Sequence, residues 1–238
     1  MSADVVGNLR RVEDRIARAC AEAGRDRGEV RLLPVSKTQP VEAILQVSAA
    51  GYRRFGENRV QEIQAKAARL REFGRDDIEF SVIGHLQANK ARVVADLASE
   101  FQALDSAHLA HELDRRCAAA GRRLDVLVQV NTSGEASKSG IAPEDAPALA
   151  SELRHCEALR VRGLMTIAIN SSDSGPVLAC FDRLVEVQRR LRDAAIAGLE
   201  WDELSMGMTN DLEHAISRGA TCVRVGRAIF GEREGNQQ

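Results

Sequence analysis

Residues 30–37 read VRLLPVSK. The branched apolar residues over 30–36 predict a short buried strand, and the polar turn at 37–40 ends it. From Val41 onward apolar residues recur at helical spacing as far as Gly51, which predicts a helix after this strand. The stretch therefore defines a unit of one buried strand and one helix, with Lys37 at the junction between them.

The same unit recurs along the chain, after an amphipathic opening helix that ends near Gly24. Buried strands are expected at residues 30–36, 52–55, 78–83, 101–104, 124–130, 161–167, 201–205 and 221–225. Helices are expected at residues 41–51, 58–73, 89–97, 106–120, 143–155, 176–197 and 211–218, with a last helical turn from residue 227. Ser106 is expected to cap its helix, and Pro143 is expected to begin one.

This alternation of strands and helices predicts right-handed βαβ units and a parallel sheet. Eight such units in 238 residues match a (β/α)8 TIM barrel with an extra N-terminal helix. We expect the barrel to span residues 1–231 and a polar tail to follow at 232–238. An open doubly wound sheet is the alternative, but it carries a Gly-rich turn after its first strand. Residues 35–39 read VSKTQ, which favours the barrel.

The composition narrows the class of protein. Hydrophobic residues make up 44% and charged residues 29% of the chain, as in ordinary globular proteins. The net charge of -2 and the 3% of aromatic residues argue against nucleic acid or an anionic membrane as a partner. Five cysteines without a CxxC pattern predict reduced thiols rather than a disulfide framework or a metal site. We expect a cytoplasmic monomer, and the many arginines and alanines favour a bacterial source.

Lysine is scarce in this chain. Lysine and arginine total 33 residues, of which only Lys37, Lys66, Lys90 and Lys138 are lysines. Lys37 follows a buried strand, and burial lowers the pKa of a lysine by disfavouring the ammonium form. A neutral amine at this position can attack an aldehyde and form a Schiff base. The alternatives are a salt bridge to Glu57 or a side chain that extends to solvent at the rim.

The ends of the last two strands predict a phosphate site. Residues 205–209 read SMGMT and residues 225–227 read VGR, so a glycine separates strand from helix in both. Barrels bind phosphate at this point through backbone amides and helix dipoles. Gly207 and Gly226 allow close approach of the backbone, and the Ser205 and Thr209 hydroxyls could donate hydrogen bonds. Either loop alone fits ordinary turn chemistry, but the two together favour phosphate.

A Schiff-base lysine and a phosphate site in one barrel suit a phosphorylated aldehyde, and pyridoxal 5′-phosphate has this shape. Arg224, on the last strand, could face the pyridine nitrogen and disfavour its protonation. The alternative for Arg224 is an ion pair inside the barrel with Glu57 or Asp211. A Schiff-base aldolase acting on a sugar phosphate would share the barrel, the lysine and the phosphate site.

Seven ordered blocks give this chain a family resemblance. They are LPVSKT at 33–38, FGEN at 55–58, IGHLQANK at 83–90, KSGI at 138–141, RGLMTI at 162–167, LSMGM at 204–208 and VRVGRAIFG at 223–231. With these blocks the sequence resembles the pyridoxal phosphate homeostasis protein family, which is related to the N-terminal domain of alanine racemase. The resemblance implies a single barrel that carries pyridoxal 5′-phosphate as a Schiff base on Lys37.

The resemblance also implies roles for the other residues of the site. Ser205, Gly207 and Thr209, with Gly226 and the amide of Arg227, would hold the phosphate, and Arg224 would face the ring nitrogen. The residues expected around the ring are Asn58, His85 and Met165. The implied function is that of a carrier that maintains intracellular vitamin B6 and amino-acid balance without established catalytic turnover. Apo-enzymes that depend on the cofactor would be transient partners.

The chain also departs from the family pattern. Asn210 follows Thr209 where the family often has an aspartate, and Gln39 stands where the family often has a lysine, which weakens the case for an accessory cofactor site. Lys138 is a candidate for such a site, although a solvated loop lysine is the simpler interpretation. A pyridoxal-phosphate-dependent amino-acid racemase is the alternative function. Two-base racemisation needs a second acid–base group, and the one tyrosine, Tyr52, is expected far from the rim.

Overall fold

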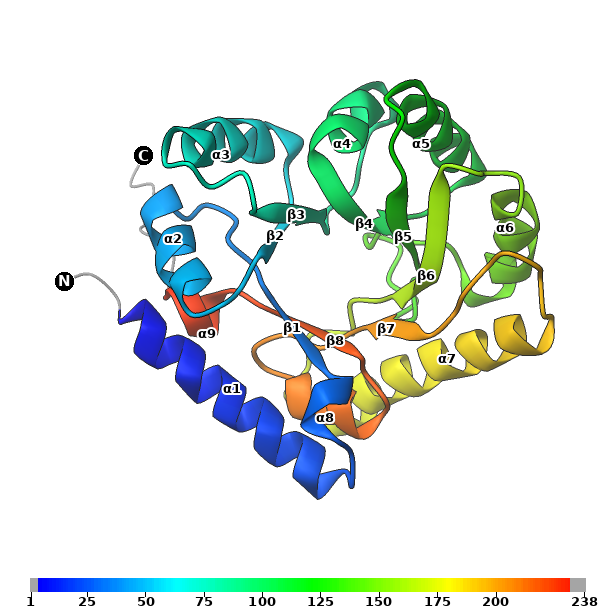
Figure 1. Ribbon diagram of the computed structural model, residues 1–238. Coiled ribbons are helices and arrows are strands. Elements are labelled where there is room, and N and C mark those ends of the chain that lie inside the picture. Colours follow the sequence, from blue (N-terminus) through cyan, green and yellow to red (C-terminus); the bar gives the residue numbers. More distant parts are fainter. Residues whose placement is uncertain (1–3, 232–238) are drawn as a thin grey trace.

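The computed structural model describes residues 4–231 and shows eight parallel strands inside a ring of helices (Figure 1). The strands are β1 (Arg31–Pro34), β2 (Arg54–Glu57), β3 (Glu79–Val82), β4 (Ala98–Leu104), β5 (Leu124–Gln129), β6 (Leu159–Met165), β7 (Glu203–Ser205) and β8 (Cys222–Val225). They pair in the order β1-β8-β7-β6-β5-β4-β3-β2. The predicted TIM barrel is confirmed, and the polar tail predicted at 232–238 lies outside the described residues.

The barrel closes between β1 and β2 at a single parallel bridge. This bridge joins Val35 to Gly56, and the amide of Ser36 donates to the carbonyl oxygen of Gly56 at 3.0 Å. A side chain at Gly56 would crowd this bridge, because a Cβ atom there would lie 3.1 Å from Cγ2 of Val35. The closing contact therefore lies directly before Lys37.

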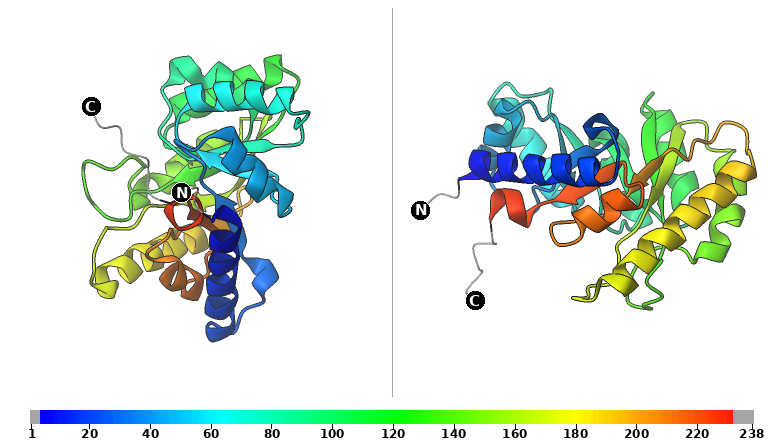
Figure 2. Two further views of the ribbon diagram at one scale, coloured as in Figure 1. Left: turned by 90° about the vertical axis from the view of Figure 1, so that its left-hand side faces the viewer. Right: turned by 90° about the horizontal axis from the view of Figure 1, so that it is seen from below.

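Helices cover the outside of the barrel. They are α1 (Val5–Glu22), α2 (Val41–Ala49), α3 (Val60–Glu72), α4 (Ala91–Leu97), α5 (Ala107–Ala119), α6 (Ala146–Leu153), α7 (Ser174–Asp193), α8 (Leu212–Ser217) and α9 (Arg227–Phe230). The extra helix α1 packs against α8 and α9 through a stripe that includes Leu9, Val12 and Ile16 (Figures 1 and 2). No helix within residues 4–231 has the length and apolar character that a membrane crossing requires.

One predicted helix cap is confirmed, whereas the starts of one helix and one strand differ from the sequence predictions. Ser106 caps α5 as expected, by accepting a hydrogen bond from the amide of Leu109 at 3.3 Å. Pro143 begins a 3-10 turn over Pro143–Asp145, and the α-helix starts only at Ala146. Strand β4 begins at Ala98 rather than at residue 101. Its polar residue Glu100 points into the barrel, and an apolar pattern does not reveal an inward-facing carboxylate.

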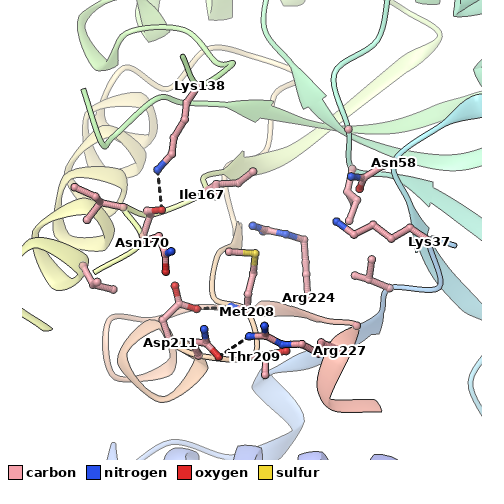
Figure 3. Close-up of a pocket in the computed structure, with 18 of the residues that line it drawn as sticks. Lys37, Asn58, Lys138, Ile167, Asn170, Met208, Thr209, Asp211, Arg224 and Arg227 are labelled. Carbon is pink, nitrogen blue, oxygen red and sulfur yellow. Dashed lines mark hydrogen bonds between the residues drawn. The ribbon is translucent and has the colours of Figure 1, made fainter. Parts of the chain in front are cut away.

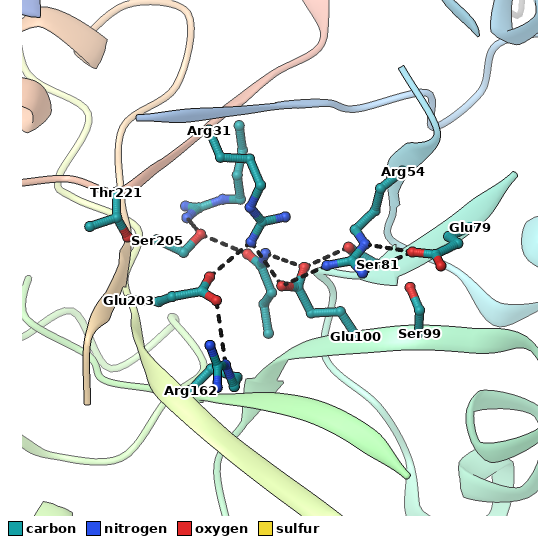
Figure 4. A network of polar contacts seen from close by, with 12 residues as sticks. Arg31, Arg54, Glu79, Ser81, Ser99, Glu100, Arg162, Glu203, Ser205 and Thr221 are labelled. Carbon is teal, nitrogen blue, oxygen red and sulfur yellow. Dashed lines mark hydrogen bonds and ion pairs between the residues drawn. The ribbon is translucent and has the colours of Figure 1, made fainter. Parts of the chain in front are cut away.

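An ion-pair network lies in the barrel core near the N-terminal ends of the strands (Figure 4). Glu100 is 1% exposed. Its carboxylate contacts Arg31 at 2.8 Å and accepts hydrogen bonds from Ser81 at 2.5 Å and from Gln102 at 2.7 Å. Burial alone would raise the pKa of Glu100, but the charge of Arg31 and these hydrogen bonds outweigh it and lower the pKa.

We predict that Glu100→Gln lowers the free energy of unfolding by about 3 kcal/mol at neutral pH, since removing one member of a buried ion pair has this effect. The lowered pKa means that the contribution of Glu100 is fully present above its unfolded pKa of 4.5 and is lost as the pH falls through the folded pKa. Urea unfolding across this range should therefore show a shallower acid limb for the variant. Glu79→Gln, which breaks the exposed pair with Arg54, is the control, and an equal effect of both variants would contradict the prediction.

Candidate functional site

A cavity of about 1310 Å³ opens at the carboxyl ends of the strands. The predicted site residues in its lining are Lys37, Asn58, His85, Thr209, Arg224, Gly226 and Arg227. The other three predicted residues, Met165, Ser205 and Gly207, are buried and do not contribute to the lining. Figure 3 shows the side chains of Lys37, Asn58, Arg224 and Arg227 on the walls of this cavity.

The loop that carries Lys37 is held by hydrogen bonds on both sides of this residue. The Lys37 side chain extends from the end of β1 into the cavity (Figure 3). On one side of it in sequence, the carbonyl oxygen of Ser36 accepts a hydrogen bond from Nζ of Lys66 at 2.7 Å. On the other side, Thr38 has a φ of 63°, and its amide donates to the Glu62 carboxylate at 2.7 Å. Lys37 therefore sits on a backbone whose conformation is set by α3.

A buried ion pair supports this loop. Lys66 is 7% exposed and Glu57 is fully buried, and Nζ of Lys66 lies 2.6 Å from Oε1 of Glu57. The Ser36 hydroxyl donates to the same carboxylate oxygen at 2.6 Å. Burial raises the pKa of Glu57, and the charge of Lys66 counteracts that effect. Glu57, a candidate partner of Lys37 on sequence grounds, thus pairs with Lys66.

Lys66 has no role among the sequence predictions, although its position carried a signal. Lys66 occurs on the same helical face as Ile63 and Leu70, and all three are buried. A lysine at core spacing, in a chain with only four lysines, indicates a buried cation with a buried anionic partner.

Arg224 forms part of the cavity wall while its guanidinium is anchored in the core. The residue is 4% exposed. Nη1 donates to the Ser205 hydroxyl at 2.7 Å, and Nη2 donates to the carbonyl oxygen of Thr166 at 2.8 Å. Burial lowers the pKa of Arg224 from its ordinary value. These contacts differ from the ion pairs with Glu57 or Asp211 that were considered from sequence.

Ser205, expected as a phosphate ligand, has another arrangement in the structure. Its hydroxyl donates to Oε1 of Gln102 at 2.7 Å and accepts from Arg224. A serine has one hydroxyl hydrogen, so this contact leaves none for an anion in the cavity. Ser205 thus acts on the site by holding Arg224.

The glycine loops after β7 and β8 provide a concave wall with available donors. Gly207 has a φ of 93°, and a Cβ atom there would lie 2.5 Å from that of Ala215. A Cβ atom at Gly226 would lie 2.9 Å from the carbonyl oxygen of Val35. Within residues 4–231, the amides of Gly226 and Arg227 donate to no protein acceptor. Two unused amides beside a side chain with a hydroxyl, Thr209, fit a phosphate group.

The remaining candidates lie around this wall. Nδ1 of His85 is 3.1 Å from the carboxylate of Asp105. Lys138 lines the same cavity, forms an ion pair with Glu135 and donates to the carbonyl oxygen of Ala168 at 3.0 Å. Its side chain is 25% exposed, so Lys138 is more enclosed than a solvated loop lysine.

Two further features are a segment of the cavity lining that was not predicted and the position of Tyr52 outside the lining. The segment 167–172, after β6, contributes a continuous stretch of the lining that the sequence analysis did not identify. The short polar run NSSDS at 170–174 was the available signal. Tyr52 lies outside the lining, as expected, and its hydroxyl donates to Glu13 on α1 at 2.9 Å. Burial raises the pKa of Tyr52.

Comparisons with known proteins identify relatives in both sequence and structure. Residues 8–234 match the family described as alanine racemase, N-terminal domain. The chain is 43% identical over 230 residues to the pyridoxal phosphate homeostasis protein of Pseudomonas aeruginosa, covering 97% of this chain and 96% of that relative. Among solved structures, it resembles an unknown protein from Bifidobacterium adolescentis with a TM-score of 0.90 and 38% identity, covering 95% of this chain and 94% of the other.

A second solved structure contains a ligand. PipY of Synechococcus elongatus, determined with PLP bound, has a TM-score of 0.79 and 35% identity to this chain. The match covers 91% of this chain and 100% of the PipY chain. The family resemblance inferred from the seven sequence blocks is therefore confirmed.

We predict that Lys66→Met lowers the free energy of unfolding by about 3–5 kcal/mol, because Glu57 is then buried without its cation. The double variant Glu57→Gln/Lys66→Met should recover part of this loss, since it removes both charges, and urea unfolding of the single and double variants measures the coupling. Lys90→Met, on a partly exposed turn, is the matched control. Equal stabilities of Lys66→Met and Lys90→Met would contradict the buried ion pair.

Proposed function

Because the chain belongs to the pyridoxal phosphate homeostasis protein family, we propose that it binds pyridoxal 5′-phosphate covalently at Lys37 and serves vitamin B6 and amino-acid homeostasis as a carrier. One observation carries this proposal most directly. The same cavity holds the Lys37 side chain, the unused amides of Gly226 and Arg227, and the anchored guanidinium of Arg224. An amine, an anion cradle and a cation are the groups that a phosphorylated pyridine aldehyde requires.

The role of Lys37 follows from its placement. When bound, the cofactor supplies an aldehyde with which a lysine amine condenses with loss of water. Lys37 is partly buried and lines the cavity. The hydrogen bonds that Lys66 and Glu62 make to residues 36 and 38 hold the loop in one conformation, so the amine is presented at a defined place in the cavity.

The phosphate group is assigned to the loops after β7 and β8, on the side of the cavity where β8 pairs with β1. The amides of Gly226 and Arg227 and the hydroxyl of Thr209 would donate to it, with the positive end of the first turn of α9 adding to the attraction. Gly207 gives the β7–α8 loop its positive φ. Ser205 is placed behind Arg224 rather than on the phosphate.

The ring is assigned to the space between Lys37 and Arg224. Arg224 would face the ring nitrogen, and a cation there disfavours protonation of that nitrogen and weakens the ring as an electron sink. Asn58 and His85 line the cavity beside this space, and Met165 would support it from within the wall. Such a site retains the cofactor without promoting carbanion chemistry.

A carrier is preferred to a racemase because the tyrosine that could act as the second acid–base group lies away from the cavity. The Tyr52 hydroxyl is bonded to Glu13 and lies outside the cavity lining. The cavity is open and far larger than one ligand ring, so water has access to the site, which suits loading and transfer. Apo-enzymes that need the cofactor are the proposed recipients. The five cysteines are buried and unpaired, which fits a reducing compartment such as the cytoplasm.

Covalent attachment is tested by borohydride reduction of the yellow protein followed by peptide mass mapping. We expect the cofactor mass on the peptide that contains Lys37. The variant Lys37→Ala should be colourless after incubation with the cofactor, whereas Lys138→Ala should stay yellow. A colourless wild-type protein, as expected of a sugar-phosphate aldolase, or a label on Lys138 alone, would contradict the assignment.

We also predict that the loaded protein turns over amino acids at least about 10³-fold more slowly than the ~10 s⁻¹ typical of enzymes. The reason is the lack of a tyrosine acid–base group in the cavity lining and the weak electron sink opposite Arg224. Racemisation and β-elimination of alanine and serine by the purified holo-protein are the reactions to measure. Turnover at ordinary enzymatic rates would favour the racemase.

A further inference from the structure

A chain of hydrogen bonds crosses the barrel core from Glu100 to Arg224. Nε2 of Gln102 donates to the Glu100 carboxylate at 2.7 Å, and Oε1 of Gln102 accepts from the Ser205 hydroxyl at 2.7 Å. The Ser205 oxygen in turn accepts from Nη1 of Arg224 at 2.7 Å. Arg31 adds its charge to Glu100 at the far end, 2.8 Å away. The chain thus joins the ion-pair network of Figure 4 to the wall of the cavity.

This arrangement is unusual for the interior of a barrel, which branched apolar side chains normally fill. Glu100 is 1% exposed, Gln102 and Ser205 are fully buried, and Arg224 is 4% exposed. Polar groups at such depth destabilise a core unless every hydrogen-bonding group is satisfied, and apolar residues of similar volume would stabilise it equally well or better. Stability alone therefore does not account for these side chains.

The hydrogen bonds between Glu100 and Arg224 have only one possible donor–acceptor order. The ionised carboxylate of Glu100 accepts and does not donate, so the amide nitrogen of Gln102 must face it. The amide oxygen then faces Ser205, which must donate its single hydrogen to that oxygen. The Ser205 oxygen can then act only as an acceptor, and it accepts a hydrogen bond from the Arg224 guanidinium. Each orientation follows from the charge on Glu100.

The guanidinium of Arg224 is consequently fixed at two points. Nη1 is bonded to Ser205, and Nη2 is bonded to the carbonyl oxygen of Thr166 at 2.8 Å. A guanidinium has five N–H donors, so those not used in the core remain for the cavity. Besides Glu100, the charged or titratable groups that act on Arg224 are Asp211 and Cys222.

We propose that Gln102 and Glu100 are positioning residues for Arg224: the hydrogen-bond chain that starts at Glu100 holds the guanidinium in the orientation in which its cation opposes protonation of the cofactor's ring nitrogen. This inference rests on the proposed function, because it concerns the group that Arg224 faces in the loaded protein. Neither Gln102 nor Glu100 lines the cavity, so both act through Ser205 and Arg224.

The test uses the full-length protein loaded with cofactor labelled with ¹⁵N at the ring nitrogen, followed by NMR as a function of pH. In the wild type we expect an unprotonated nitrogen at neutral pH. In Gln102→Met, which keeps the length but removes both hydrogen bonds, the nitrogen should take up its proton at a pH higher by about one unit or more, equivalent to a tenfold shift in the equilibrium. Gln102→Asn, one methylene too short to reach both partners, should shift it in the same direction.

Two further variants separate positioning from general stability. Ser81→Ala removes a different hydrogen bond to Glu100 and lies off the path to Arg224, so it should leave the ring nitrogen unchanged. Gln102→Glu should keep the wild-type titration of the ring nitrogen. A carboxyl group beside Glu100 stays protonated and then offers one donor and one acceptor, as the amide does.

Equal ¹⁵N titrations of wild type, Gln102→Met and Gln102→Asn, or an equal shift in Ser81→Ala, would overturn the inference while leaving the proposed function intact. A wild-type protein that takes up no cofactor at Lys37 would overturn the proposed function, and this inference with it. A crystal structure of the cofactor-free Gln102→Met protein adds an independent readout. It should show the Arg224 guanidinium displaced from Ser205, and an undisturbed guanidinium would count against the proposal.

Discussion

The bridge between Val35 and Gly56 is the contact on which the rest of the molecule depends. It is the point at which the two end strands of the sheet meet and the barrel closes. Closure brings the carboxyl ends of eight strands around one opening, so that residues from distant parts of the chain line a single cavity. Lys37 follows this bridge by two residues. The interaction that closes the barrel therefore also determines where the amine lies.

Two buried polar systems reinforce this constraint from different sides. Lys66 and Glu57 hold the backbone beside Lys37 from the outside of β1, whereas Glu100 and Gln102 hold Arg224 from the core. Both systems place charges where apolar residues would pack with less desolvation. Their common effect is that the two basic groups proposed to act on the ligand, Lys37 and Arg224, do not have to reorganise when it binds.

Sequence patterns predicted the barrel well because strand–helix alternation is a property of apolar periodicity. They also predicted the positions of Lys37 and Gly226, which directly follow clear strands. The same patterns gave no role to Gln102, since a polar residue in a periodic pattern is normally read as exposed, and only the closed barrel shows this side chain to be buried. The core spacing of Lys66 indicated burial, but its contact with the backbone beside Lys37 depends on how α3 packs against β1 and β2. Ser205 was placed at the correct rim, but its hydroxyl direction depends on Gln102, which lies 103 positions away in the chain.

A crystal structure of the protein grown with pyridoxal 5′-phosphate tests the central claim most directly. The account predicts electron density continuous from Nζ of Lys37 to the cofactor, with the phosphate against the amides of Gly226 and Arg227 and the ring nitrogen opposite Arg224. A Lys37 side chain that points away from the ligand, or a phosphate bound elsewhere with these amides facing solvent, would contradict it.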